Sequence, residues 1–231
     1  MRAARLRATG WCVLAGCLLA RSAGALGVGE LTNREAARGI EGALEQGAAA
    51  AVAKLGVPGG FLNNPKVKIP LPPALDEAAK AMRMLGRGRD ADRLVEAMNQ
   101  AAEMAVPYAK PMLESAVKSM TFEDAKKILT GGDGSVTQYF EARTAAPLAA
   151  AFLPIVKRET DKVGLAQKYD QLAAQGEKFG LIKGEASIEE YVTRKTLDGL
   201  YLMIGEEEHA IREHPAAAAS AIVTKVFGAL R

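Results

Sequence analysis

Apolar residues recur along most of this chain at the spacing of an α-helix. Between residues 37 and 55 they stand three or four positions apart, which places them on one helical face (Ala37, Ile40, Leu44, Ala48, Ala51 and Leu55). Thr32, followed three residues later by Glu35, predicts a capping box at the start of this helix. Gly56 and Pro58 predict its end.

The same pattern predicts helices along the rest of the chain, at residues 74–85, 90–105, 121–130, 135–163, 165–174, 187–211 and 215–227. After residue 105 we expect a restart with Pro107 or Pro111 in its first turn, where the missing N–H is harmless. Pro147 and Pro154 predict kinks inside 135–163. Residues 59–73 contain four prolines and predict a loop, with at most one short extended piece at 66–69.

Strands and helices do not alternate, and no segment repeats at a fixed period. We therefore predict an all-α fold, a single compact domain of about eight short or proline-kinked helices. Because alanine buries little apolar area, we expect the larger side chains to stabilise the core. The ones we expect there are Phe122, Phe140, Phe152, Tyr139 and Tyr201.

The N-terminal segment follows the order of a secretory signal. The first 29 residues contain no Asp or Glu, Arg2, Arg5 and Arg7 form a basic head, and residues 11–20 are uninterruptedly apolar or small. Residues 23–25, Ala-Gly-Ala, offer small side chains to a signal peptidase. We expect residues 1–25 to be removed and residues 26–231 to form a helical domain that is periplasmic or secreted.

Two other interpretations of this segment stay open. Leu14 to Cys17 resembles a bacterial lipobox, which would leave the protein lipid-anchored at Cys17, although Leu18 and Leu19 continue the apolar run past that cysteine. An Arg-rich, acid-free start also suits import into an organelle. Later in the chain the longest apolar stretch, residues 145–156, is 12 residues long and contains two prolines. A spanning helix needs about 20 residues, so we expect no transmembrane span in the mature chain.

Cleavage after Ala25 changes the charge and the cysteine content. It removes four arginines, so Lys+Arg falls from 30 to 26 against 27 acids, and the net charge falls from +3 to −1. A nearly neutral chain gives no electrostatic reason to expect nucleic-acid binding. Cys12 and Cys17 both leave, which excludes a disulfide, a thiolate metal site and a cysteine nucleophile from the mature chain.

The two histidines of the chain are His209 and His214. Glu206 and His209 make one Glu-x-x-His step, whereas a carboxylate-bridged di-iron site needs two such steps and two further Glu. The spacing also misses the zinc-protease patterns. We favour a solvated helix end in which His209 pairs with Glu213, the alternative being a single open zinc site. Neither histidine is well placed as the base of a serine triad, and no Gly-x-Ser-x-Gly motif is present.

Residues 131–135, Gly-Gly-Asp-Gly-Ser, stand at the start of a predicted helix. No Gly-Lys-Ser/Thr follows them, and Gln138 stands where a calcium loop needs a glycine. We favour a turn between two helices with Asp133 or Ser135 as the N-cap. An anion held by the amides of that helix start is the alternative.

Five residues are candidates for ligand binding: Tyr139, Arg143, Asp161, Lys162 and Asn99. If the kinks at Pro147 and Pro154 fold the chain back, Arg143 would meet Asp161 or an anionic ligand bidentately. The alternative is a set of surface charges with an internal ion pair. Asn99 and Glu103 either line a pocket or form hydrogen bonds within the core. We predict no catalytic residue, no metal site and no cofactor.

Several segments of the chain also resemble one bacterial family. They are FLNNP at 61–65, VKIPLP at 67–72, MNQAAE at 98–103, AKKILTGGDGSVTQ at 125–138, TDKVGL at 160–165 and LDGL at 197–200. Together they are similar to the domain of unknown function with the number four thousand one hundred and ninety-seven. The resemblance implies an exported, helical, single-domain protein, and it implies no activity.

We therefore expect a non-catalytic binding or structural component of the cell envelope, with partners unknown. The alternatives are a hydrolase that uses carboxylates without metal or nucleotide, and an envelope protein anchored through Cys17.

Overall fold

A computed structural model describes residues 33–84, 88–162, 164, 167, 169, 187–217 and 220–228. The predicted signal segment 1–25, with Cys12 and Cys17, lies outside the described residues, and so do Thr32 and most of the predicted helix at 165–174. The described part of the chain is helical and contains no strand, which confirms the all-α prediction.

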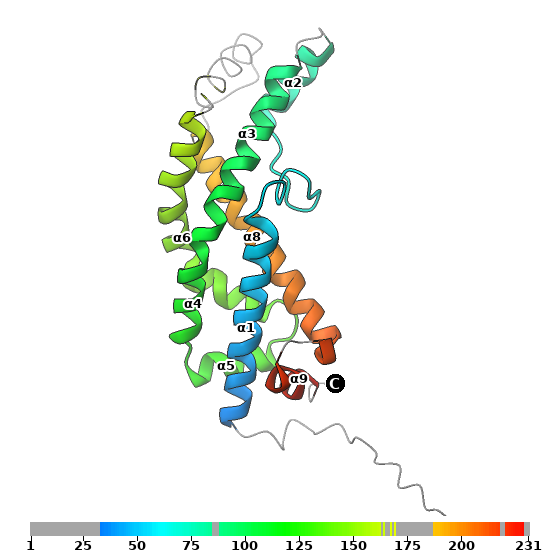
Figure 1. The fold of residues 1–231 in the computed structure, drawn as a ribbon, viewed down its shortest axis with the longest axis vertical. Coiled ribbons are helices and arrows are strands. Elements are labelled where there is room, and N and C mark those ends of the chain that lie inside the picture. Colours follow the sequence, from blue (N-terminus) through cyan, green and yellow to red (C-terminus); the bar gives the residue numbers. More distant parts are fainter. Residues whose placement is uncertain are drawn as a thin grey trace, which may run out of the picture.

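The helices follow the predicted order closely. They are α1 (Asn33–Leu55), α2 (Pro73–Met84), α3 (Arg89–Ala105), α4 (Lys110–Lys118), α5 (Phe122–Thr130), α6 (Ser135–Lys162), α8 (Ile188–Glu213) and α9 (Ala221–Gly228), with 3-10 turns η2 (Val106–Ala109) and η3 (Pro215–Ala217). In Figure 1 the green column of α3 and α4 runs along the long axis of the molecule beside α1 and α6. The colours also show that α6 and α8 run in opposite directions.

Prolines lie at the start of η2 and α4 and in the interior of α6. Pro107 and Pro111 lie in the first turns of η2 and α4, which confirms the predicted restart. Pro147 and Pro154 lie inside α6, which stays one helix over 28 residues and does not fold back. Both are exposed, so the carbonyl groups that lose an N–H partner face water. The predicted long helical stretch is therefore confirmed.

The core contains most of the side chains expected there. The apolar stripe of α1 is buried from Ile40 to Leu55, and Phe140 and Phe152 of α6 are fully buried. Phe122 is the exception, because it is 43% exposed. It follows the N-cap Thr121 directly, and the first turn of α5 turns it toward solvent.

The loop between α1 and α2 lies against α8, and its Ile69 also contacts Asn99 of α3. Phe61 packs so closely on α8 that a Cβ at Gly199 would lie 2.7 Å from its ring. The Tyr191 hydroxyl donates to the Pro70 carbonyl at 3.1 Å. Residues 66–69 form no strand, which agrees with the predicted loop.

Candidate functional site

Two of the five predicted ligand-binding residues lie together, one turn apart on α6. The Arg143 guanidinium lies 5.6 Å from the centre of the Tyr139 ring. The Tyr139 hydroxyl donates to the Ala116 carbonyl of α4 at 2.8 Å, and burial raises the pKa of Tyr139. The Tyr139 hydroxyl is therefore neutral and fixed by the protein itself.

Arg143 has an internal ion-pair partner. Its Nη2 lies 3.2 Å from Oδ2 of Asp124, at the start of α5. Hydrogen bonds from the hydroxyl and the N–H of Thr121, together with the charge of Arg143, hold the pKa of Asp124 below its ordinary value. Of the alternatives left open by the sequence, the structure shows the internal ion pair.

Asp161 and Lys162 lie far from Arg143, at the other end of α6. Eighteen residues separate Arg143 from Asp161, which in an unbroken helix is about 27 Å. The predicted contact between Arg143 and Asp161 is therefore wrong, because the chain continues through both prolines. Lys162 pairs with the buried Glu159 at 2.7 Å, and this contact, followed by that of Arg158, lowers the pKa of Glu159.

Asn99 lies in the core, on α3, and binds the backbone of the loop. Its Oδ1 accepts from the N–H of Ile69 at 2.8 Å, and its Nδ2 donates to the carbonyls of Ile69 and Val95 at 2.9 and 2.7 Å. One turn on, Oε1 of Glu103 accepts from the N–H groups of Phe61 and Leu62, each at 3.0 Å. These contacts are hydrogen bonds within the core, which is the second of the two predicted alternatives. That any of the five residues contacts a ligand stays a prediction.

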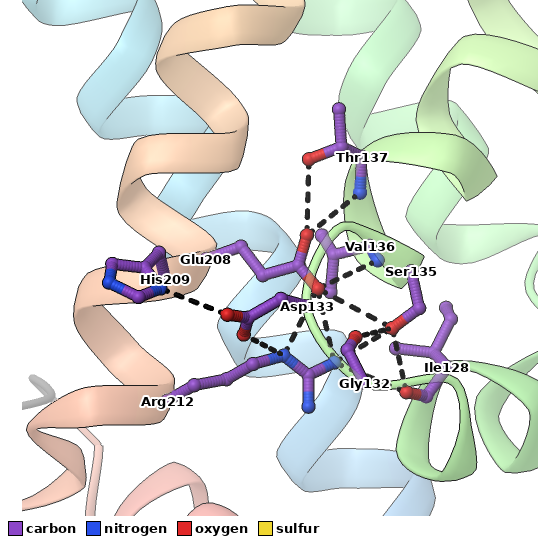
Figure 2. Close-up of polar contacts among 9 residues, drawn as sticks. All are labelled: Ile128, Gly132, Asp133, Ser135, Val136, Thr137, Glu208, His209 and Arg212. Atoms are coloured by element: carbon purple, nitrogen blue, oxygen red, sulfur yellow. Dashed lines mark hydrogen bonds and ion pairs between the residues drawn. The ribbon is translucent and has the colours of Figure 1, made fainter.

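A polar cluster that the sequence analysis did not predict joins α8 to the start of α6, and Figure 2 shows its contacts. Glu208 is buried, and its carboxylate accepts from the N–H groups of Val136 and Thr137 at 3.0 and 3.1 Å and from the Thr137 hydroxyl at 3.1 Å. The amides at a helix N-terminus lack intrahelical partners and attract negative charge. Glu208 supplies that charge, so the predicted N-cap role of Asp133 or Ser135 is wrong.

Arg212 completes this cluster from the next turn of α8. Its Nε and Nη2 donate to Oε1 of Glu208 at 3.1 and 3.0 Å, and Nη2 also donates to Ser135 and to the Ile128 carbonyl. We call Glu208, Arg212 and the first turn of α6 the latch. The prediction that this end of α8 is solvated is therefore wrong for Glu208, which is buried. His209 is exposed, as predicted, but it contacts Asp133 at 3.0 Å.

A groove with an apolar floor runs along the contact between α6 and α8. Its first section has a volume of about 570 Å³. Ligand sites commonly have 300 to 1,000 Å³, by a rough estimate. Its apolar lining consists of Ala145, Ala146, Ala149, Ala150, Leu153, Leu197 and Tyr201, and its charged rim consists of Glu141, Glu190, Arg194 and Asp198.

A second section continues the groove toward the latch. It has a volume of about 780 Å³ and shares Glu141, Asp198 and Tyr201 with the first section, so the two form one depression. It extends to Gly205 and His209, and Leu202, which is 46% exposed, lies on its lining. We call the two sections together the α6–α8 groove.

The groove contains a buried hydroxyl without a partner. Thr193 lines the first section and is 5% exposed, and among the described residues no group forms a hydrogen bond with its Oγ1. Other buried threonines are satisfied: Thr196 donates to the Val192 carbonyl, and Thr144 donates to the Phe140 carbonyl and contacts Tyr201. An unpaired buried hydroxyl destabilises a protein, so the Thr193 hydroxyl lowers the stability of the fold beside the groove.

Comparison with known protein families places the chain. A model of the family described as "Protein of unknown function (DUF4197)" matches residues 30–228. The chain belongs to this family. No curated protein and no solved structure gives a significant match.

Two further findings concern the described part of this DUF4197 domain. It contains no group of three or more His, Cys, Asp or Glu side chains able to hold a metal ion. None of its described helices combines the length and the apolar character that crossing a membrane requires.

Sequence signals for the latch and the groove exist in the DUF4197 domain, although they are weak. Glu208 and Arg212 stand four residues apart, as ion pairs on one helix do. Ala145, Ala149 and Leu153 repeat every four residues on α6, which aligns small side chains in one row. Neither pattern reveals which other helix it meets.

Proposed function

We propose that the protein is an exported, non-catalytic binding protein of the bacterial cell envelope, and that the α6–α8 groove is its binding surface. The observation that carries the binding role is the concave apolar lining between α6 and α8, with charged residues at its rim. Apolar concavities with a few polar groups are the usual form of binding sites.

The state of the other polar groups supports binding rather than the carboxylate-driven hydrolase considered from the sequence. Glu208 and Glu103 are buried and bind backbone amides, so their carboxylates serve the fold. The rim residues Glu141, Glu190 and Asp198 are exposed to solvent. A hydrolase of that kind needs one carboxyl group with a raised pKa, which burial would provide.

Export is supported by the basic, acid-free start of the chain and its apolar run. The test is the intact mass of protein purified from its native host. We expect the mass of the chain that begins at residue 26. A mass that includes a lipid on Cys17 would replace plain cleavage with anchoring, and the uncleaved mass in the cytosol would refute export.

The binding role is tested with Nile red, a neutral dye whose fluorescence rises in apolar surroundings. Ala150 and Ala142 are both exposed alanines of α6, but only Ala150 is among the groove residues listed above. We expect wild type and Ala142→Phe to enhance the fluorescence of the dye, and Ala150→Phe to abolish the enhancement. Equal enhancement by all three proteins would refute binding in the groove.

A further inference from the structure

The charges at the groove rim indicate what kind of occupant fits. Three carboxylates, Glu141, Glu190 and Asp198, face one guanidinium, that of Arg194. Asp198 pairs with Lys195 at 3.1 Å, and Arg194 lies over the Tyr191 ring at 5.7 Å. Within the described part of the chain, Glu141 and Glu190 have no ion-pair partner. The rim is therefore negative and complementary to an occupant that carries positive charge.

The spacing of these two carboxylates along the groove indicates the length of its occupant. Glu190 stands at the start of α8, and Glu141 lies beside Tyr201, eleven residues further along α8. Eleven helical residues span about 16 Å. The whole groove, from Glu190 to His209, spans about 28 Å of α8 by the same measure. A depression of this length suits an extended occupant better than a compact small molecule.

The floor of the groove has the form of a seat for a helix. Ala145 and Ala149 of α6 and Gly205 of α8 keep the surface low along the line between the two helices. Helices pack with their axes about 8 to 10 Å apart, and small side chains at the contact allow the shorter distances. Leu202 and Leu153 then offer apolar contacts toward the two ends.

We propose that the α6–α8 groove binds an amphipathic helix of a partner protein that carries Lys or Arg at two positions about 16 Å apart along its apolar stripe. The basic side chains meet Glu141 and Glu190, and the apolar stripe covers the alanine floor. The helix-in-groove mode uses apolar anchors at positions i, i+3, i+4 and i+7. This inference rests on the groove being a binding surface, as proposed above.

The test uses two fluorescein-labelled synthetic peptides of about 18 residues, a length that spans the groove. Both have the same Leu/Ala stripe. One carries two Lys residues eleven positions apart, which matches the spacing of Glu190 and Glu141, and the other carries Glu at the same positions. Binding to the full-length protein is measured by fluorescence anisotropy at low and at high salt. Because exposed ion pairs contribute modestly, we expect the Lys peptide to bind about tenfold more tightly than the Glu peptide at low salt.

Variants of the protein separate specific from unspecific binding. Glu141→Lys with Glu190→Lys should reverse the preference between the peptides, and Ala150→Phe should abolish binding of both. Ala142→Phe is the matched control and should bind as wild type does. Equal affinity of the two peptides, or unchanged binding to Ala150→Phe, would overturn the proposal.

Two other occupants give different results. A small apolar molecule retained in native mass spectra of the host protein, together with no peptide binding, would overturn this inference and leave the proposed function intact. A wild-type dimer that Ala150→Phe converts to a monomer in sedimentation would show that a second copy fills the groove, and this too would overturn it. Loss of both Nile red and peptide binding in wild type would refute the proposed function itself.

Discussion

Replacing Thr193 by Val should stabilise the free protein, because its hydroxyl is buried and no group in the described part of the chain forms a hydrogen bond with it. Val has nearly the same shape as Thr and a similar helix propensity, so the substitution changes little except the hydroxyl. An unpaired buried polar group costs roughly 1 to 3 kcal/mol. We therefore expect the free energy of unfolding to rise by about 1 to 2 kcal/mol.

The control is Thr196→Val, one turn along the same helix. Thr196 is also buried, but its hydroxyl donates to the Val192 carbonyl at 2.7 Å. Removing a satisfied hydroxyl forfeits about 1 kcal/mol, so this variant should be less stable than wild type. The two substitutions are chemically identical, and their effects should have opposite signs.

The assay is urea unfolding followed by circular dichroism, with thermal unfolding as a second measurement. For a chain of this size we expect the melting temperature of Thr193→Val to rise by about 2 to 8 °C. If Thr193→Val destabilises the protein as much as Thr196→Val does, the Thr193 hydroxyl has a partner and the reasoning is wrong.

Three further predictions follow from the packing and the charges. Glu208→Ala leaves two helix amides without a partner and removes the buried carboxylate that Arg212 pairs with, so urea unfolding should show a loss of about 3 kcal/mol. Glu206→Ala, at the exposed pair with Lys66, should cost less than about 1 kcal/mol. Gly199→Ala should lower the melting temperature, because its Cβ would lie 2.7 Å from the Phe61 ring. Gly47→Ala is the control and should raise the melting temperature through helix propensity, because its Cβ would lie 3.5 Å from Glu207. A higher melting temperature in both variants would contradict this packing. In the folded state the pKa of Asp124 is lowered, first of all by the hydrogen bond from the Thr121 hydroxyl. The ionised Asp124 therefore stabilises the fold at a pH above its ordinary pKa of 3.8, and this stabilisation is lost as the pH falls through the lower pKa of the folded state. Asp124→Asn should therefore flatten the acid limb of a plot of the urea midpoint against pH, and an unchanged limb would show that Asp124 does not contribute to it.

The sequence predicts the local features of this fold well. The apolar stripe of α1 follows from spacing alone, and Pro107 and Pro111 mark their restarts because a proline fits best in the first turn of a helix. Phe122 was misplaced because size suggests burial, whereas its position directly after the cap Thr121 decides which way it faces. Local rules thus locate helices and their ends, and they do not show which face of a short helix meets a neighbour.

The candidate site was harder to predict because its contacts join distant parts of the chain. Glu208 and Val136 are 72 residues apart, and nothing near either residue shows that they meet. The run of acids at 206–208 has the composition of a solvated helix end, although one of its members is buried against the amides of α6. The sequence leaves open whether Arg143 meets Asp161, an anionic ligand or an internal partner, because the first of these requires the prolines to reverse the helix, and the exposed prolines of α6 do not do so.

The latch and the groove belong to the same pair of helices, which links stability to binding. Glu208 fixes the start of α6 against the last turns of α8, and Thr137 and His209, on either side of this contact, line the near end of the groove. The two helices are long and run in opposite directions (Figure 1), and the contact between Thr144 and Tyr201 joins them further along. The latch and this contact together fix α8 against α6, so a change at Glu208 that leaves the fold intact should alter binding mainly at the end of the groove that Thr137 and His209 line.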